Sequence, residues 1–287
     1  MTGAQFCPVG KLEKLLLAID GSIHSEGAIR EAISFASKCS SKLYACMVLE
    51  TNPEYETIGS NVFEKEEEEA RAHLESVKSG AAKEGVTCET IFHESVEASQ
   101  AIVDEATDKK VDMIVIGRHG RKGLLKAFMG ELAEKVIINA PCKVLVVPKA
   151  AKIEYRNILV ATDGSGHSIS AVQEAVNIAK RCGSRIIALS SVRSDSELER
   201  ARANVNKVLD MAKSEGIEAE GLTPAGRSYN VIVETAGGRG VDLIVMGMPV
   251  KSELGKFFTG SATEKVIGTA GCAVLIVKGE ASVSATV

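Results

Sequence analysis

The chain of 287 residues contains two copies of one pattern, and this repeat constrains its fold more than any other feature. Leu15–Ser22 (LLLAIDGS) matches Ile158–Ser165 (ILVATDGS) 143 positions later, and Val111–Gly117 matches Val241–Gly247 130 positions later. The change of offset indicates a deletion of 13 residues in the second copy. We expect it between the second strand and the next helix, where the first copy carries the additional stretch around 51–63. The repeat predicts two domains of one fold, residues 1–150 and 151–287, the second with a short C-terminal tail.

Each copy alternates short apolar runs with amphipathic stretches. In the first copy the predicted strands are Lys14–Asp20, Lys42–Leu49, Thr87–His93, Asp112–Gly117 and Lys143–Pro148. The predicted helices are Ser25–Cys39, Glu64–Glu84, Ala98–Lys109 and Glu131–Asn139. Two of the strands are apolar at every position, which is typical of strands buried on both faces. This alternation predicts an α/β fold with two tandem, doubly wound, parallel five-stranded sheets, Rossmann-like, with strand order 3-2-1-4-5 and helices on both faces.

The composition excludes several classes of protein. Aromatic residues make up only 4 % of the chain and Trp is absent, so stacking surfaces for single-stranded nucleic acid are scarce. The net charge of -4 also disfavours a protein that binds phosphate backbones, and we expect no nucleic-acid partner. Seven scattered cysteines without a CxxC pair favour a reducing compartment. Because no apolar run has the length of a signal peptide or a membrane span, we expect a cytoplasmic protein with no membrane contact.

The fold predicts where a ligand binds before any motif is named. In a doubly wound sheet, ligands bind beyond the carboxyl ends of the strands where the strand order reverses, here between strands 1 and 4. Asp20 leaves strand 1, the segment Gly117-Arg118-His119-Gly120 leaves strand 4, and Gly130 precedes a helix. Glycines allow close backbone approach and positive φ, and a helix N-terminus attracts anions. These features predict a phosphate site; the alternative is a glycine-rich surface loop with solvated basic residues.

The combined motifs resemble the universal stress protein family. They are a strand ending in Asp-Gly-Ser, a buried strand ending in Gly, and a Gly-x2-Gly-x9-Gly segment that Ser or Thr follows. The resemblance covers nearly all of residues 12–278. It implies that the chain is a tandem member, similar to the branch that binds ATP or another adenine nucleotide (ADP or AMP) between strands 1 and 4. Mg²⁺ would accompany ATP.

The resemblance implies a set of binding residues in the first copy. Asp20 would contact the adenosine moiety and Val48 the adenine edge. Ribose and phosphates would lie against the loop residues Gly117, Arg118, His119, Gly120 and Gly130. Glu131 departs from the pattern by replacing Ser or Thr. Its carboxylate either lies near the phosphates or points to solvent while complementing the helix dipole.

The second copy departs from the pattern at another position. It keeps Asp163, Gly247, Gly260 and Ser261, but Val250 replaces the second glycine, and its branched side chain disfavours positive φ. We therefore favour the first copy as the nucleotide site. The second copy binds a shorter nucleotide such as AMP, or none. The counterpart of Val48 is either Ser191 or Val192.

Other residues that recur at matched positions have simpler interpretations. These residues are His24 and His167, Ser22 and Ser165, Cys39 and Cys182, and Cys142 and Cys272. We interpret the histidines as polar residues at helix starts rather than metal ligands, because no second ligand accompanies them. The serines suit helix caps better than nucleophiles, and the cysteines suit packed thiols.

Three functions are compatible with these patterns. The first is a cytosolic stress-response or signalling protein that binds adenine nucleotide without catalysis. The second is an interaction or scaffold protein of the same fold that binds no nucleotide. A slow ATP hydrolase ranks last, because the sequence shows no triad, paired carboxylates or Walker lysine. The fifth strands, Lys143–Pro148 and Ala273–Lys278, would be sheet edges that need covering. We expect the two domains to pair through these strands, with an additional homodimer and an unidentified protein partner left open.

Overall fold

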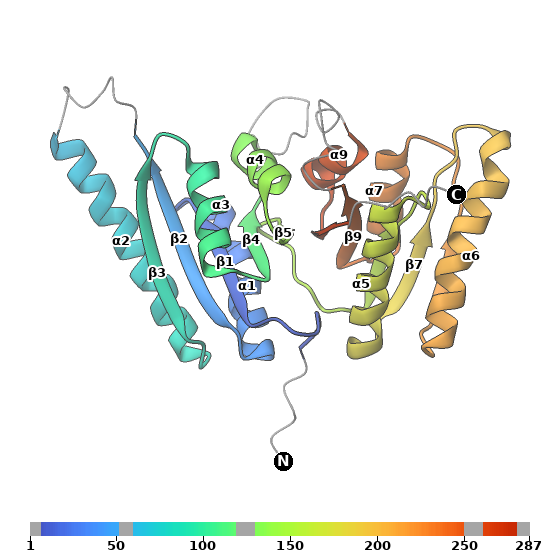
Figure 1. Cartoon of the computed structure of the whole chain (residues 1–287), viewed down its shortest axis with the longest axis horizontal. Helices are drawn as coiled ribbons and strands as arrows, with labels where there is room; N and C mark the ends of the chain where they lie inside the picture. The colour runs from blue at the N-terminus through green and yellow to red at the C-terminus, as the bar shows by residue number, and fades with distance from the viewer. Residues whose placement is uncertain (1–6, 52–59, 119–129, 250–260, 280–287) are drawn as a thin grey trace, which may run out of the picture. The chain divides into compact units, whose positions relative to one another are not determined.

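The computed structural model describes residues 7–51, 60–118, 130–249 and 261–279 (Figure 1). These residues form two compact units that divide along the chain between Lys149 and Ala150, except that Pro8–Gly10 group with the second unit. Among the described helices, none combines the length and the apolar character that crossing a lipid bilayer requires.

The first unit alternates strands and helices as the sequence predicts. Its elements are β1 (Lys14–Ile19), the short η1 (Ile23–Ser25), α1 (Glu26–Cys39), β2 (Lys42–Glu50), α2 (Ser60–Lys83), β3 (Cys88–Ser95), α3 (Ala98–Lys109), β4 (Met113–Gly117), α4 (Glu131–Asn139) and β5 (Lys143–Val147). The bounds of α3 and α4 agree with the predicted ones, and so does one end each of β1, β2, β4, β5 and α1. The remaining ends differ by one or two residues, or by four at the start of α2.

The second unit repeats this order. Its elements are β6 (Asn157–Ala161), α5 (Gly166–Cys182), β7 (Arg185–Leu189), η3 (Asp195–Glu197), α6 (Leu198–Ser214), β8 (Ala219–Leu222), α7 (Ser228–Gly238), β9 (Leu243–Met248), α9 (Ala262–Thr269) and β10 (Ala273–Lys278).

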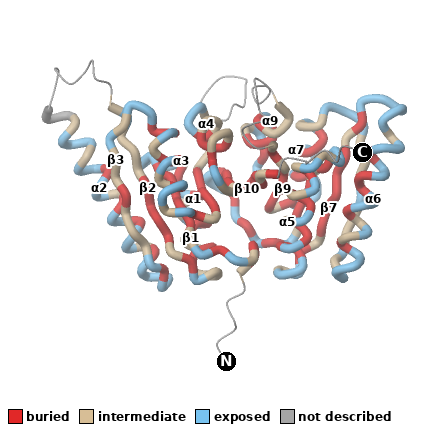
Figure 2. Tube along the Cα trace, viewed as in Figure 1, coloured by how far each residue is buried: buried red, intermediate tan, exposed pale blue. Residues whose placement is uncertain are grey.

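The predicted strand order is confirmed in both units. The order is β3-β2-β1-β4-β5 in the first unit and β8-β7-β6-β9-β10 in the second, with parallel neighbours throughout. Helix α1 contacts α2, α3 contacts α4, and both pairs contact the central strands. The strands β1 and β4 are almost wholly buried, which explains why their sequences do not alternate (Figure 2).

The same ion-pair arrangement recurs in both copies and supports the alignment of the repeat. In the first unit, Glu89 on β3 accepts hydrogen bonds from Lys42 Nζ at 2.7 Å and Lys109 Nζ at 3.3 Å. In the second unit, Glu220 lies 2.7 Å from Arg185 Nη2 and 2.9 Å from Arg239 Nη1. The hydrogen bond from Lys42 is the main cause that lowers the pKa of Glu89. Each carboxylate joins two strands to the end of a crossover helix.

The structure confirms the predicted place of the deletion for most of its residues and corrects it for one. Gly85 and Gly216 follow α2 and α6 in the left-handed conformation, with φ of 72° and 70°. They lie 131 positions apart, whereas the offset is 143 before this point and 130 after it. Twelve of the thirteen residues are therefore lost before α6, and the last is lost between β8 and α7. The sequence comparison missed this step because β3 and β8 share few residues.

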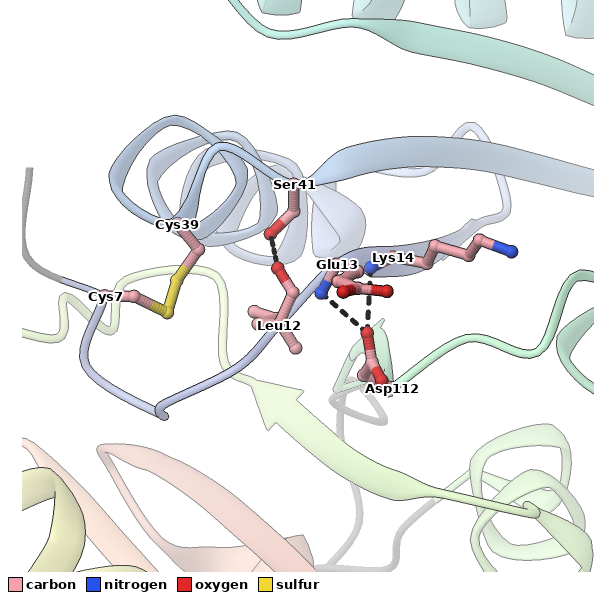
Figure 3. Close-up of a disulfide and its surroundings, with 7 residues drawn as sticks. All are labelled: Cys7, Leu12, Glu13, Lys14, Cys39, Ser41 and Asp112. Atoms are coloured by element: carbon pink, nitrogen blue, oxygen red, sulfur yellow. Dashed lines mark hydrogen bonds between the residues drawn. A yellow bond between two sulfur atoms is a disulfide. The ribbon is translucent and has the colours of Figure 1, made fainter.

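The structure also corrects the interpretation of two cysteines. Cys7 and Cys39 form a disulfide with a Cα–Cα distance of 4.4 Å (Figure 3). The expectation of reduced, packed thiols is therefore wrong for Cys39, and the cysteines no longer favour a reducing compartment. Cys272 is buried as expected. Cys142 and Cys182 are only half-buried. The pairing was not visible in the sequence because the partners lie 32 positions apart and only one of them has a counterpart in the second copy.

Further contacts hold the segment that follows Cys7. Ser41 donates a hydrogen bond to the carbonyl of Leu12, and Asp112 Oδ2 accepts the backbone N–H groups of Glu13 at 2.7 Å and Lys14 at 2.9 Å (Figure 3). The disulfide and these bonds fix the entry into β1, so the carboxyl end of that strand has a defined position.

Candidate functional site

A cavity of about 330 Å³ lies at the carboxyl ends of β6, β7 and β9 in the second unit. This volume falls at the lower end of the range for small-molecule pockets, about 300–1,000 Å³. Its walls come from the strand ends and from the first turns of α5, α6, α7 and α9. The residues used below are Asp163, His167, Ser191, Arg193, Arg200, Asn204, Ser228, Gly247 and Ala262. The cavity therefore occupies, in the second copy, the place in the fold where a ligand is predicted, whereas the sequence favours the first copy.

Asp163 lies in this cavity and organises the turn from β6 into α5. Its Oδ1 accepts the backbone N–H of Ser165 at 3.0 Å, and the Ser165 hydroxyl caps α5 by accepting the N–H of Ser168. Gly164 has φ of 81°, and a Cβ there would lie 2.4 Å from Asn204 Oδ1. The residues Asp, Gly and Ser thus meet the hydrogen-bonding and conformational needs of one tight turn. The predicted capping role of Ser165 is confirmed.

The surroundings of Asp163 favour its ionised form. Burial by itself would raise its pKa, but the hydrogen bonds from Ser165 and Ser168, together with nearby His167, outweigh burial and lower the pKa of Asp163. The His167 Nε2 lies 3.0 Å from the Ser165 hydroxyl oxygen, so this histidine belongs to the same hydrogen-bonded turn. The turn therefore presents a carboxylate that could accept hydrogen bonds from a ligand hydroxyl or amine.

The corresponding turn of the first unit is built in the same way. Asp20 Oδ1 accepts the N–H of Ser22 at 3.0 Å and the hydroxyl of Ser25 at 2.6 Å. Gly21 has φ of 72°, and the Ser22 hydroxyl accepts the N–H of His24. The capping role predicted for Ser22 is confirmed, and the repeated motif has a structural purpose in both copies.

The glycines that end β4 and β9 pack against backbone rather than bending. Neither Gly117 nor Gly247 has a positive φ. A Cβ on Gly117 would lie 2.8 Å from the carbonyl oxygen of His24, and one on Gly247 would lie 2.0 Å from that of His167. The expectation of a positive φ is therefore wrong for Gly117. Both glycines instead permit close contact between the strand and the first turn of the neighbouring helix.

The two helices that would face phosphates begin differently. Gly130 is the N-cap of α4 in an extended conformation, with φ of -61°. Glu131 is 81 % exposed and pairs with Lys135 at 3.2 Å, so its carboxylate points to solvent. In the second unit, Ser261 caps α9 by accepting the N–H of Glu264 at 3.1 Å. Only the second copy therefore offers a capping hydroxyl at this position.

The ends of β2 and β7 settle the counterpart of Val48. Val48 is half-buried in β2 and pairs with His93 of β3. Ser191 lines the cavity and its hydroxyl lies 2.7 Å from that of Ser228, whereas Val192 is 7 % exposed and turned away into the core. Ser191 is therefore the counterpart of Val48.

Several predicted residues lie outside the part of the chain that the structure describes. They are His119, Gly120, Val250 and Gly260. Arg118 is described, and its backbone N–H donates to the carbonyl of Val147 at 3.2 Å. The glycine-rich loop of the first copy consequently stays a prediction.

Sequence reasoning missed the basic residues of the cavity in the second unit. Arg193 and Arg200 line it from the segment around η3 and from α6, and Asn204 is buried behind them. A signal was present in the sequence, because Glu50 holds the position in the first copy that Arg193 holds in the second. This reversal of charge could have directed attention to the position.

Comparisons with known proteins agree with the fold. The sequence pattern of the universal stress protein family matches residues 11–148 and 154–278. A universal stress protein of Methanocaldococcus jannaschii is 37 % identical over 144 residues, which cover 49 % of this chain and 84 % of the relative. One from Synechocystis is 29 % identical over 149 residues, covering 47 % and 96 %.

Solved structures extend the likeness to both units. The crystal structure of a universal stress protein from Archaeoglobus fulgidus has a TM-score of 0.74 at 19 % identity and covers 92 % of this chain and 98 % of its own. A universal stress protein from Pseudomonas aeruginosa gives 0.70 at 21 % identity, covering 93 % and 94 %. At these identities the likeness concerns the fold. Because the family pattern matches twice and accounts for most of the residues, the chain belongs to the universal stress protein family as a tandem, two-domain member.

Proposed function

We propose that this protein binds an adenine nucleotide, ATP, ADP or AMP, and acts in a cytoplasmic stress response or in signalling without catalysing a reaction. The observation that carries the proposal is the cavity at the carboxyl ends of β6, β7 and β9. It lies at the switch point where doubly wound sheets bind ligands. The Asp163 carboxylate on its wall suits a ribose hydroxyl, because an ionised carboxylate accepts hydrogen bonds.

The second copy supports this function by its charges as well as its shape. The first turns of α5 and α9 contribute partial positive charge, and Arg193 and Arg200 add two cations. We therefore assign the nucleotide to the second copy. Binding by the first copy, which the glycine pattern favours, is a separate proposal that depends on the loop 119–129.

Isothermal titration of the whole chain with adenosine, AMP, ADP and ATP tests the proposal. We expect one nucleotide per chain when the second copy alone binds. Ser191→Phe would fill the cavity of about 330 Å³ in the second unit. Val48→Phe is the matched change in the first copy. Loss of binding only in Ser191→Phe supports the assignment. If none of the four ligands binds at millimolar concentration to folded protein, the proposal is wrong and an interaction protein without nucleotide is favoured.

Turnover is tested in the same samples. We expect ADP and phosphate not to accumulate when ATP is bound. Release of phosphate that disappears in Ser191→Phe would assign hydrolysis to this cavity and would contradict the proposal of binding alone. Release that is equal in both variants would indicate a contaminating enzyme.

A further inference from the structure

A second cavity of about 300 Å³ adjoins the first in the second unit. The two share Arg193, Ser228 and Ala262. Its remaining walls are Arg227, Tyr229 and Lys265, and we call these six residues the basic annex. They come from the segment after β7, the start of α7 and the middle of α9, so three elements that are distant in sequence bring them together.

The basic annex gathers positive charge that the described part of the chain does not neutralise. Arg193, Arg227 and Lys265 form no ion pair with any described carboxylate. Lys265 Nζ lies 5.1 Å from the centre of the Tyr229 ring, a cation–π contact that leaves its charge in place. The Glu197 carboxylate accepts the backbone N–H of Arg193 at 2.7 Å.

Helix α7 adds to this field. It begins at Ser228, and its N-cap Arg227 makes no capping hydrogen bond through its side chain. The N-terminus of a helix carries unpaired N–H groups and partial positive charge. At this position most helices carry an acidic or hydroxyl side chain, so an arginine supplies no side-chain acceptor for the first N–H groups of the helix.

The first copy shows which side chains satisfy the same place in the fold there. There the repeat puts Glu50 and Glu97 in the positions of Arg193 and Arg227, and Lys135 in the position of Lys265. Glu50 Oε1 accepts the N–H of Ala98 at the start of α3, at 3.4 Å. Glu97 pairs with Lys135 Nζ at 3.4 Å. Glu50 thus serves the helix start, and Glu97 serves the lysine together with Glu131.

In the second copy both carboxylates are replaced by arginines, while the lysine and the helix start remain. We propose that the basic annex binds a phosphate group, which takes the place that the carboxylates of Glu50 and Glu97 fill in the first copy. Arginine and a helix start both suit phosphate oxygens, the former through paired donors. The phosphate belongs either to a nucleotide in the adjoining cavity or to free inorganic phosphate. Binding of free phosphate does not depend on the proposed nucleotide function, whereas binding of a nucleotide's phosphate rests on it.

The experiment uses the full chain and four probes, namely inorganic phosphate, pyrophosphate, ATP and adenosine, by isothermal titration. Arg227→Glu restores the acid of the first copy and suits a helix start, so we expect it to fold. Lys213→Glu makes the same change of charge in the last turn of α6 and is the matched control. Thermal unfolding of each variant verifies folding. We expect Arg227→Glu to weaken phosphate binding at least about tenfold, because hydrogen bonds to charged groups are lost.

The outcomes separate the sources of the phosphate and the two proposals. Binding of inorganic phosphate that Arg227→Glu weakens and Lys213→Glu does not supports a free phosphate. If Arg227→Glu weakens the binding of ATP but not of adenosine, and inorganic phosphate does not bind, the annex holds a phosphate of the nucleotide. Phosphate binding without any nucleotide or adenosine binding supports the annex while the proposed function fails. Equal effects of the two variants, or no effect of Arg227→Glu on any probe, overturns the proposal.

Discussion

Replacing Gly247 by alanine tests whether this glycine serves packing or ligand approach. A Cβ there would lie 2.0 Å from the carbonyl oxygen and 2.4 Å from the carbonyl carbon of His167, and 2.8 Å from the nitrogen of Ser168. All three atoms are backbone atoms of the first turn of α5, so no side-chain rotation relieves the clash. The helix must move away from β9, which also changes the wall of the larger cavity.

The matched positions define a graded series. Gly117→Ala brings a Cβ to 2.8 Å from the carbonyl oxygen of His24, and Gly237→Ala in α7 meets nothing within 4 Å. Overpacking costs about 1–3 kcal/mol, so we expect a loss of about 3 kcal/mol for Gly247→Ala and about 1 kcal/mol for Gly117→Ala. Gly237→Ala should gain about 0.5 kcal/mol from helix propensity.

Denaturant unfolding of the full chain, followed by circular dichroism, measures these free energies. Gly247→Ala acts on the second unit and Gly117→Ala on the first. If the two units unfold in separate transitions, each substitution should shift the denaturant midpoint of its own unit only. If Gly247→Ala unfolds like the unmodified chain and loses only nucleotide affinity, the glycine serves ligand approach and the packing argument is refuted.

Three further predictions follow from the described contacts. Cys39→Ser should lower the free energy of unfolding by about 3–4 kcal/mol, because the disulfide closes a loop of 32 positions; a reductant should do the same to the unmodified chain, and equal denaturant midpoints with and without it would contradict this. The lowered pKa of Asp163 stabilises the fold above the unfolded-state pKa of about 3.9 and is lost as the pH falls through the folded-state value, so the stability difference from Asp163→Asn should shrink below about pH 4 in acid titrations; a constant difference speaks against it. Glu220→Gln should cost about 1 kcal/mol by weakening its contacts with Arg185 and Arg239, and Glu89→Gln about the same in thermal unfolding; no change in either would show that solvent screens these pairs.

The paired architecture of this chain allows one copy to serve as the control for the other. Glu50 and Glu97 in the first copy and Arg193 and Arg227 in the second occupy matched positions with opposite charge. A ligand that distinguishes the copies would therefore do so by its charge. The expected pairing of the domains through their fifth strands, and a homodimer, stay predictions that light scattering and crosslinking would test.

Local patterns in the sequence were sufficient for the backbone. The apolar runs of β1 and β4, the helix start at Ser165 and the order of the strands follow from burial, capping and the handedness of crossovers. Each of these depends on neighbouring residues or on a rule that holds for every parallel sheet. The repeat also located Asp20 and Asp163 at strand ends without any coordinates.

The tertiary structure alone decided what depends on contacts between distant segments. Gly117 and Gly247 read as phosphate glycines in the sequence, but the carbonyls of His24 and His167 lie where their side chains would be. The pairing of Cys7 with Cys39 required the path of the segment before β1. Arg193, Arg227 and Lys265 line one cavity only because the fold brings together the segment after β7, the start of α7 and helix α9. A sequence specifies such convergence only through the whole fold, because the residues involved share no local period or turn.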